Sequence, residues 1–543
     1  MTRKVPAGVS SVEVKGLGTL RGVSYTDGVR QFYGIPYARL KKRWTLSKLA
    51  ASWENDAHDG TKLGKHYPIP PQHDSTNDPR VPVKEIEQFS GWIPDELECL
   101  NLNLAVPPQS ASGAGPYPVM VYIHGGAYWF GGNFVPIYDV ANLVSHSVKQ
   151  DHPVIAVSIN YRLGIGGFLA SRQIGEELKK DGFAGNGNFA LRDQQVALDW
   201  IQRYIAQFNG DPDNVTIFGE SAGGISVAHQ VMAARPAKFR RAIQMSGSLN
   251  LTESWPIERH QKRYDWLSDS LDQLRNVSQE ELCKATLVIE PSDFTVYNTC
   301  DDGHFHGERP GLAYGSALPP WLDSIMIGDT LDEGELWRGV VSKHDVPFYR
   351  KRLELHMSTA EAARVCELYG ISAEAPREQS IQGLVDMTAD MMFKMQNYVI
   401  AHRSNVKKTF AYHVDQRSTL DHCLKGQAYH AIDLLYVFLN GKEAMSAEQI
   451  VLAERMASDW IAFAHGKEPW EPFASNKRWM IYGPEKHQST WDLQSEVQDE
   501  PVRRYSRFRA LLKDGLYEKL YNAVQDIAHE RYRLEGYKPE LPN

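Results

Sequence analysis

The chain has 543 residues, of which 42% are hydrophobic and 23% charged, a composition typical of a globular protein with a large core. Its formal net charge of -8 argues against nucleic acid or an anionic membrane as the main partner, because both select for basic surfaces. No apolar run approaches the roughly 18 residues that a membrane span needs. No linker or repeat divides the chain, so we predict one domain over residues 1–543. The expected partner is a small molecule. The oligomeric state stays open.

Short β-rich runs alternate with helical patterns between about residues 115 and 250, which predicts parallel strands joined by crossover helices. An amphipathic helix is predicted over 189–208, where leucines and isoleucines recur at helical spacing. Strands are predicted at 119–123, 154–159, 215–218, 242–245, 325–327 and 410–414. The predicted fold class is therefore α/β, with a mostly parallel central sheet and helices on both faces.

Two long segments, about 251–320 and 340–400, lie between these strands and carry helical patterning with many polar residues. Connecting segments run over the surface and often carry binding residues. We expect both insertions to lie over one edge of the sheet and to form the walls of a cleft.

A candidate nucleophile elbow, Gly219-Glu220-Ser221-Ala222-Gly223, lies between the strand at 215–218 and a helix-like stretch at 225–232. The strand-turn-helix context is the arrangement that exposes a serine hydroxyl at a sheet edge. Glycine before and after the serine permits a sharp turn in which side chains would collide. The alternative interpretation is a glycine-rich turn in which the serine only caps a helix.

An oxyanion hole is predicted at His124-Gly125-Gly126-Ala127, directly after the strand at 119–123. This run matches the HGGG-type loop, whose backbone N–H groups point at the developing negative charge. One such donor stabilises a transition state by roughly 2.7 to 4 kcal/mol.

An acid and a base complete the candidate site. Glu333, in an Asp-Glu-Gly run after the strand at 325–327, is the candidate acid, and His430, beyond the strand at 410–414, is the candidate base. The chain order of serine, acid and histidine is the one that α/β-hydrolases use. Asp332 and His422 are alternatives for the acid and base roles.

The chain resembles the type-B carboxylesterase and cholinesterase family of α/β-hydrolases, and the resemblance extends over nearly its whole length. The most specific segments are Asn160-Tyr161-Arg162-Leu163-Gly164, Asn188-Phe189-Ala190-Leu191-Arg192-Asp193-Gln194 and Phe218-Gly219-Glu220-Ser221-Ala222-Gly223-Gly224. The resemblance implies an α/β-hydrolase fold with no cofactor and no metal. It also implies Ser221 as nucleophile, His430 as base and Glu333 as the orienting acid.

The resemblance further implies oxyanion donors at the backbone N–H groups of Gly126, Ala127 and Ala222, with Gly125 shaping the loop. Ala127 stands where the family usually has a third glycine. An alanine keeps its N–H, so the hole persists if the local backbone torsions tolerate a Cβ atom.

Four further residues are expected around the reacting groups. Glu220 precedes the nucleophile, and Ser246 resembles a serine that steadies the acid in this family, although a packed serine at a strand end is an equal alternative. Tyr128 and Trp129 follow the oxyanion donors and are candidates for an acyl pocket. Because consecutive side chains cannot all face one cavity, at least one aromatic in this run belongs to the core.

The cysteine pattern predicts a cytoplasmic location. In the family that the chain resembles, the position of Cys99 is usually disulfide-bonded to an upstream cysteine, which is missing here, and a second bridge usually has a partner where Gln273-Leu274-Arg275 stands. No apolar run of a secretory signal follows the N-terminus. Reduced thiols are the rule in the cytosol.

These observations predict a serine hydrolase that cleaves carboxylic esters through an acyl-enzyme. Two alternatives remain open. The first is a specialised acyltransferase, lactonase or amidase acting on a secondary metabolite, because the same three residues serve all of these reactions. The second is a non-catalytic binding protein with the same fold.

Overall fold

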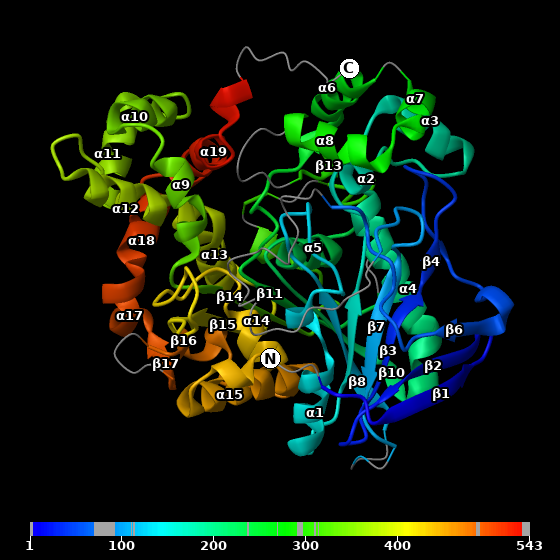
Figure 1. The fold of residues 1–543 in the computed structure, drawn as a ribbon. Coiled ribbons are helices and arrows are strands. Elements are labelled where there is room, and N and C mark those ends of the chain that lie inside the picture. The colour runs from blue at the N-terminus through cyan, green and yellow to red at the C-terminus, as the bar shows by residue number, and fades with distance from the viewer. Residues whose placement is uncertain are drawn as a thin grey trace.

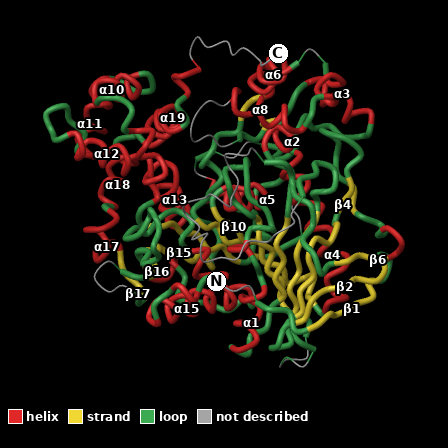
Figure 2. The backbone as a smooth tube through the Cα atoms, in the orientation of Figure 1, coloured by secondary structure: helices red, strands yellow, loops and turns green. Residues whose placement is uncertain are grey.

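A large twisted sheet with helices on both faces forms the centre of the molecule (Figures 1 and 2). The computed structural model describes residues 4–69, 93–109, 111, 115–235, 238–268, 270–289, 297–308, 311–312, 314–484 and 489–534. The predicted fold class, a mostly parallel central sheet with helices on both faces, is confirmed.

The main sheet has 13 strands in the order β1-β2-β3-β7-β9-β8-β10-β11-β14-β15-β16-β17, with β6 beside β2. From β9 to β16 all neighbours run parallel, and both ends of the sheet are antiparallel. The strands are β1 (Gly8–Val14), β2 (Gly18–Ser24), β3 (Arg30–Pro36), β6 (Ala57–Asp59), β7 (Asn101–Val106), β8 (Tyr117–Ile123), β9 (Ile155–Ile159), β10 (Gly210–Glu220), β11 (Arg241–Met245), β14 (Ser324–Thr330), β15 (Lys408–Val414), β16 (Arg478–Tyr482) and β17 (Trp491–Ser495).

Two short ribbons complete the strands, and the helices fill the connections between them. The ribbons are β4 (Ala38–Arg39) with β5 (Lys48–Leu49), and β12 (Trp255–Pro256) with β13 (Cys300–Asp301). The helices are α1 (Ala141–Lys149), α2 (Gly164–Phe168), α3 (Arg172–Lys180), α4 (Phe189–Tyr204), α5 (Ala222–Val231), α6 (Ile257–Leu267), α7 (Leu271–Asn276), α8 (Gln279–Ile289), α9 (Arg338–Val341), α10 (Val346–Glu354), α11 (Thr359–Tyr369), α12 (Arg377–Ala389), α13 (Met395–Arg403), α14 (Asp433–Phe438), α15 (Ala447–Ala464), α16 (Phe473–Asn476), α17 (Glu496–Arg503), α18 (Tyr505–Lys513) and α19 (Tyr517–Ala528).

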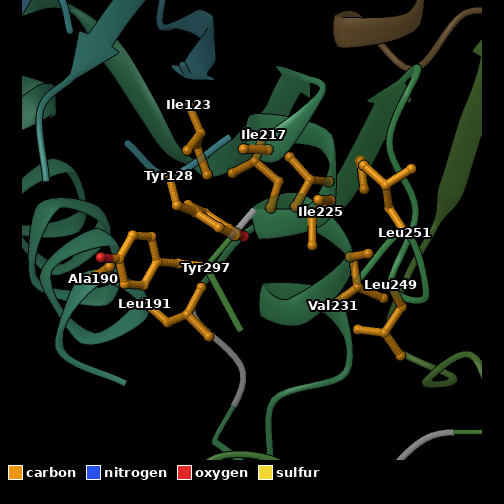
Figure 3. Close-up of a cluster of buried hydrophobic side chains, with 14 of the residues drawn as sticks. Ile123, Tyr128, Ala190, Leu191, Ile217, Ile225, Val231, Leu249, Leu251 and Tyr297 are labelled. Carbon is orange, nitrogen blue, oxygen red and sulfur yellow. The ribbon is translucent and has the colours of Figure 1, made fainter. Parts of the chain in front are cut away.

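Two hydrophobic cores lie on opposite faces of the sheet. Along β8, Val121 and Ile123 belong to one core, while Tyr122 belongs to the other, because successive side chains of a strand point to opposite faces. The first core is covered by α4 and α5, and Figure 3 shows the part of it around Ile217 and Ile225. The second core contains the apolar faces of α1, α14 and α15. Burial on both faces explains why these parallel strands are apolar throughout.

The register of β8, β10 and β11 brings three loops to one edge of the sheet. Gly219 pairs with Ile123 on one side, and Glu220 pairs with Met245 on the other. Loops that follow parallel strands meet at the same sheet edge. The elbow after β10 therefore lies between the loop after β8 and the loop after β11.

Two element boundaries differ from the predictions by more than three residues. The helix predicted over 189–208 is α4 followed by a tight 3-10 turn, Ile205–Phe208. The elbow strand begins at Gly210, five residues earlier than predicted at Val215, because Gly210 pairs with Tyr117 before an irregularity in the register. Tertiary pairing therefore extends a strand through an Asp-Pro-Asp run that reads locally as a turn.

A buried ion pair joins two of the three most specific motif segments. The Arg162 Nε and Nη2 atoms each lie 2.7 Å from a carboxylate oxygen of Asp193, and both side chains are almost fully buried. The Ser47 hydroxyl also donates to this carboxylate at 2.7 Å. This bidentate pair ties the loop after β9 to the first turns of α4.

The two helical insertions contain α6–α8 and α9–α13. In Figure 1, α6 and α8 are drawn above α5, and α10 to α12 at the upper left. That these segments form the walls of a cleft stays a prediction.

None of the five cysteines, which all lie in described residues, forms a disulfide. Within the described chain, no helix is both long and apolar enough to cross a membrane.

Candidate active site

Ser221 lies in the sharp turn between β10 and α5, with a half-buried side chain. Its φ of 55° is rare for a residue with a side chain. A Cβ atom on Gly223 would fall 2.0 Å from the Ile123 carbonyl oxygen, and one on Gly219 would fall 2.5 Å from Gly223. Both glycines are therefore required by the close approach of α5 to β8 and β10, as expected for an elbow.

The loop after β8 lies against the elbow. A Cβ atom on Gly125 would fall 3.1 Å from the Ser221 Cβ, and Gly126 has a φ of +105°. Among the described residues, no hydrogen-bond acceptor is recorded for the N–H groups of Gly126, Ala127 or Ala222. These three donors are therefore available to a ligand, which is the property that an oxyanion hole needs.

Ala127 adopts the left-handed conformation, with a φ of 54°. This conformation costs an L-residue roughly 1 to 2 kcal/mol. Two backbone hydrogen bonds hold the segment: the Tyr297 N–H donates to the Ala127 carbonyl at 3.4 Å, and the Gly164 N–H donates to the Tyr128 carbonyl at 2.7 Å. The Cβ atom that replaces the family's third glycine is thus accommodated with some strain.

A neutral histidine supports the same loop. His124 is buried, and burial lowers its pKa to about 4. Its Nδ1 lies 2.8 Å from the Gly125 carbonyl, and its ring stacks on Tyr161 at 4.3 Å. The Tyr161 hydroxyl donates to the His124 carbonyl at 2.6 Å. The imidazole is therefore a structural group in the loop rather than a proton carrier.

Glu333 is fully buried directly after β14, at the start of a 3-10 helix, Glu333–Trp337. One carboxylate oxygen accepts the Thr330 N–H at 2.8 Å, and the other lies 2.6 Å from the His430 Nδ1. The structure thus pairs the predicted acid with the predicted base. Such a carboxylate fixes the orientation and tautomer of the imidazole.

Asp332, the alternative acid, instead anchors the loop that carries the base. Its carboxylate accepts the Ala428 N–H at 2.8 Å and an Arg417 Nη1 at 3.2 Å. Its own N–H donates to the Ala428 carbonyl at 3.0 Å. The alternative base, His422, contacts the Ser418 hydroxyl at 3.1 Å, whereas the Glu333 carboxylate is bound to His430. The geometry therefore favours Glu333 and His430.

Glu220 lies on the other side of the base. Its Oε1 is 3.0 Å from the His430 Nε2, although the alignment is not that of a hydrogen bond. Burial lowers the pKa of His430, but the charges of Glu220 and Glu333 outweigh it and raise that pKa to about 10. Within the described chain, no hydrogen bond between His430 and the Ser221 hydroxyl is recorded. In this arrangement His430 is protonated at neutral pH.

Asp433 is a buried acid that sequence reasoning did not single out. Its carboxyl group accepts the Tyr412 hydroxyl at 3.4 Å. Burial, followed by the charges of Glu220 and Glu333, raises the pKa of Asp433 well above its ordinary value. A raised pKa favours the protonated form of the Asp433 carboxyl group. Its position three residues after His430 could have indicated a location near the base.

The remaining predicted residues are packed in different ways. Ser246 donates its N–H to the Gly328 carbonyl at 2.8 Å, and its buried hydroxyl has no hydrogen-bond partner in the described chain, so no contact with Glu333 is recorded. Tyr128 is buried in the core, with its hydroxyl 3.0 Å from that of Ser226. Trp129 lines a cavity of about 20 Å³, together with Leu282, Cys283 and others. Such a space holds about one water molecule.

The described residues provide no metal centre, because no group of three or more histidine, cysteine, aspartate or glutamate side chains is arranged to hold an ion. The polar groups that meet at this sheet edge are instead a hydroxyl, an imidazole, carboxylates and backbone N–H groups. That set is suited to acyl transfer.

Solved structures similar to this chain include esterases. A para-nitrobenzyl (PNB) esterase superimposes with a TM-score of 0.73 at 27% identity, covering 92% of this chain and 99% of the esterase. A thermophilic PNB esterase gives the same TM-score at 26% identity over the same shares. These matches confirm the predicted α/β-hydrolase fold.

Curated relatives include lipases and esterases. Lipase 3 of Yarrowia lipolytica is 30% identical over 524 residues, covering 92% of this chain and 96% of the lipase. The para-nitrobenzyl esterase of Bacillus subtilis is 30% identical over 502 residues, covering 88% and 94%. A secreted lipase of Arthroderma benhamiae is 32% identical over 504 residues and covers 83% of each chain, so the relatives do not support the predicted cytoplasmic location.

The relatives also include an inactive carboxylesterase-like protein of Byssochlamys spectabilis, 27% identical over 351 residues, covering 59% of this chain and 55% of that protein. The model of the carboxylesterase family matches residues 9–507, which is nearly the whole chain. The protein therefore belongs to the carboxylesterase family and is an ester hydrolase by membership.

Proposed function

We propose that the protein hydrolyses small-molecule carboxylic esters through an acyl-enzyme, with Ser221 as nucleophile, His430 as base and Glu333 as the orienting acid. The observation that carries the proposal is the 2.6 Å contact between the His430 Nδ1 and Glu333. This contact lies beside the elbow, because Glu220, next to Ser221 in the chain, touches the same imidazole.

The reaction begins when the His430 Nε2 accepts the proton of the Ser221 hydroxyl and the serine oxygen attacks the ester carbonyl. The negative charge on the carbonyl oxygen is received by the N–H groups of Gly126, Ala127 and Ala222, each worth roughly 2.7 to 4 kcal/mol. The imidazolium then protonates the departing alcohol. In the second half, His430 activates water, which releases the acid and restores Ser221.

The charge state of His430 governs when this reaction can start. Two carboxylates raise the pKa of His430, and an imidazolium cannot accept a proton. Turnover is therefore expected to increase as the pH rises through that pKa, because the fraction of neutral His430 increases.

The test is hydrolysis of a chromogenic p-nitrophenyl ester by the wild type and by Ser221→Ala. We expect the substitution to lower kcat/KM by several orders of magnitude, because the nucleophile is lost. Ser147→Ala removes the hydroxyl of a fully buried serine on α1, on the opposite face of the sheet, and is the control for effects on folding. Activity of Ser221→Ala near that of the wild type would refute the assignment.

A non-catalytic role is the second candidate, and two observations favour it. The resting His430 contacts Glu220 rather than Ser221, and one relative is described as inactive. A fluorophosphonate probe separates the two candidates, since it forms a covalent adduct only with an activated serine. An adduct on Ser221 supports catalysis, and a chain that stays unlabelled at every accessible pH supports the binding protein.

Transfer to another acceptor, lactone opening and amide hydrolysis use the same three residues. A product assay with the ester, a lactone, an amide and an added alcohol acceptor separates these reactions from simple hydrolysis. The single domain over residues 1–543, the cleft walls at 251–320 and 340–400, and the cytoplasmic location remain predictions.

A further inference from the structure

A π-helical turn, Asp390–Lys394, interrupts the long helical segment between α12 and α13. A π-turn carries one more residue than an α-helical turn, is rare, and is frequent at functional sites. The sequence pattern of 340–400 indicated only helices. The turn therefore needs a physical reason.

Side-chain hydrogen bonds support the turn. The Gln396 Nε2 donates to the Met391 carbonyl at 3.1 Å and to the Met392 carbonyl at 3.3 Å, and the Gln396 Oε1 accepts the Ser248 hydroxyl. The Lys394 ammonium donates to the Leu331 carbonyl at 2.7 Å. Leu331 belongs to the link between β14 and Glu333, so the turn is tied directly to the segment that carries the acid.

The turn presents Phe393 to the base. The Phe393 side chain is 2% exposed, and its ring centre lies 5.0 Å from that of His430 at an interplanar angle of 41°. On another side the ring lies 5.6 Å from Trp337, which ends the 3-10 helix that starts at Glu333. Phe393 therefore contacts both the base and the helix that carries the acid.

We propose that Phe393, presented by the π-turn, is a positioning residue for His430: its ring packs on the imidazole and limits the movement of the Nε2 atom, which lies at the elbow beside Glu220 and must reach Ser221 during acylation. The inference rests on the proposed function, because it assigns Phe393 a part in the same reaction. This role explains why the helix contains a π-turn at Asp390–Lys394. Removing the extra residue would rotate Phe393 about the helix axis by about 100°, away from the base.

The imidazole of His430 keeps some freedom of movement between its two carboxylate neighbours. The Nδ1 forms a hydrogen bond with Glu333, whereas the contact of the Nε2 with Glu220 is not aligned as a hydrogen bond, so the ring can still tilt about the Glu333 contact. A tilt moves the Nε2 atom away from the nucleophile, and a misplacement of about 1 Å can cost about 100-fold in rate. An aromatic ring against the imidazole limits this tilt.

The first experiment compares Phe393→Leu with Phe463→Leu. Phe463 is a fully buried phenylalanine on α15 in the opposite core, 5.8 Å from the ring of Phe410. We expect Phe393→Leu to lower the acylation rate constant about 10- to 100-fold with KM little changed, and Phe463→Leu to leave both near wild type. Phe393→Tyr keeps the ring and should restore most of the rate.

The second variant, Lys394→Met, leaves Phe393 in place and removes the bond to the Leu331 carbonyl. We expect a smaller loss of acylation rate, again without a change in KM. If Phe393→Leu does not fold, this variant still tests the proposal. The proposal is overturned if Phe393→Leu acylates at the wild-type rate, or if it loses no more rate than Phe463→Leu. If Phe393→Leu is unfolded, a wild-type acylation rate in Lys394→Met overturns the proposal instead.

A readout that does not depend on turnover separates failure of this inference from failure of the proposed function. The proton between the His430 Nδ1 and Glu333 should give a downfield NMR resonance, assigned by its absence in His430→Gln. We expect Phe393→Leu to broaden or shift this resonance and Phe463→Leu to leave it unchanged. An unaltered resonance in Phe393→Leu overturns the positioning role even if the wild type shows no esterase activity.

Discussion

Replacing Glu220 with glutamine is expected to move the pH dependence of turnover to lower pH. Glu220 and Glu333 both contact His430 and together raise its pKa to about 10. Glutamine has nearly the same shape as glutamate but carries no charge, so Glu220→Gln removes one of the two charges that stabilise the imidazolium. The pKa of His430 falls, and neutral His430 becomes available at lower pH.

The size of this change follows from the 3.0 Å separation of the Glu220 Oε1 and the His430 Nε2. At an effective dielectric constant of about 20, two unit charges at this distance attract by about 5.5 kcal/mol. That upper bound equals about 4 pH units. Opposite charges at close range in proteins change a pKa by about 1 to 3 units, so we expect a decrease within that range.

The assay is the pH profile of kcat/KM for a p-nitrophenyl ester. Its rising limb reports the pKa of the base in the free enzyme, and in Glu220→Gln this limb should lie about 1 to 3 pH units lower than in the wild type. Asp433→Asn is the comparison: burial and the charges of Glu220 and Glu333 raise the pKa of Asp433, which favours its protonated form, so this substitution should move the limb less than Glu220→Gln does. An unmoved limb in Glu220→Gln would refute the electrostatic argument.

Three further substitutions test the framework of the site. Glu333→Ala should lower kcat about 10,000-fold, because His430 loses its orienting acid. Asp332→Ala should lower kcat far less, because this substitution only loosens the loop that carries His430. Equal losses in kcat would contradict these roles. Gly223→Ala should destabilise the fold by about 1 to 3 kcal/mol or more, because the new Cβ atom falls 2.0 Å from the Ile123 carbonyl oxygen. An unchanged midpoint of thermal unfolding would contradict the close approach of α5 to β8. Arg162→Met should cost about 3 to 5 kcal/mol in denaturant unfolding, because it leaves a buried aspartate without its partner, and a wild-type midpoint would show that the pair is dispensable.

Much of the centre of the fold could be predicted from the sequence, since the relevant signals are local. Apolar runs of five to seven residues, such as Tyr117–Ile123 and Ile155–Ile159, form strands buried on both faces, and burial on both faces is what a continuous apolar run indicates. The elbow is equally local, because the collisions that require Gly219 and Gly223 arise within one turn and its neighbouring strand. The start of β10 was harder to predict, since its first residue is held by pairing with β8.

The acid and base were identified by their position after predicted strands and by chain order, and the structure brings them together. The choice between Glu333 and Asp332 could not be made from composition, because both are acidic residues at the same strand end. The structure directs the Glu333 carboxylate to the imidazole and the Asp332 carboxylate to the Ala428 backbone. One residue of difference along a tight turn reverses the direction in which a side chain points.

By itself, the sequence determined the fold class, the elbow around Ser221 and the candidates for the oxyanion loop, the acid and the base, because short motifs and strand periodicity reflect local backbone requirements. Only the tertiary structure decided that Glu220 lies 3.0 Å from the base and that Phe393 packs on it. The His430–Glu333 contact joins residues 97 positions apart. Contacts at that separation depend on sheet register and on a π-turn, and neither leaves a local pattern in the sequence.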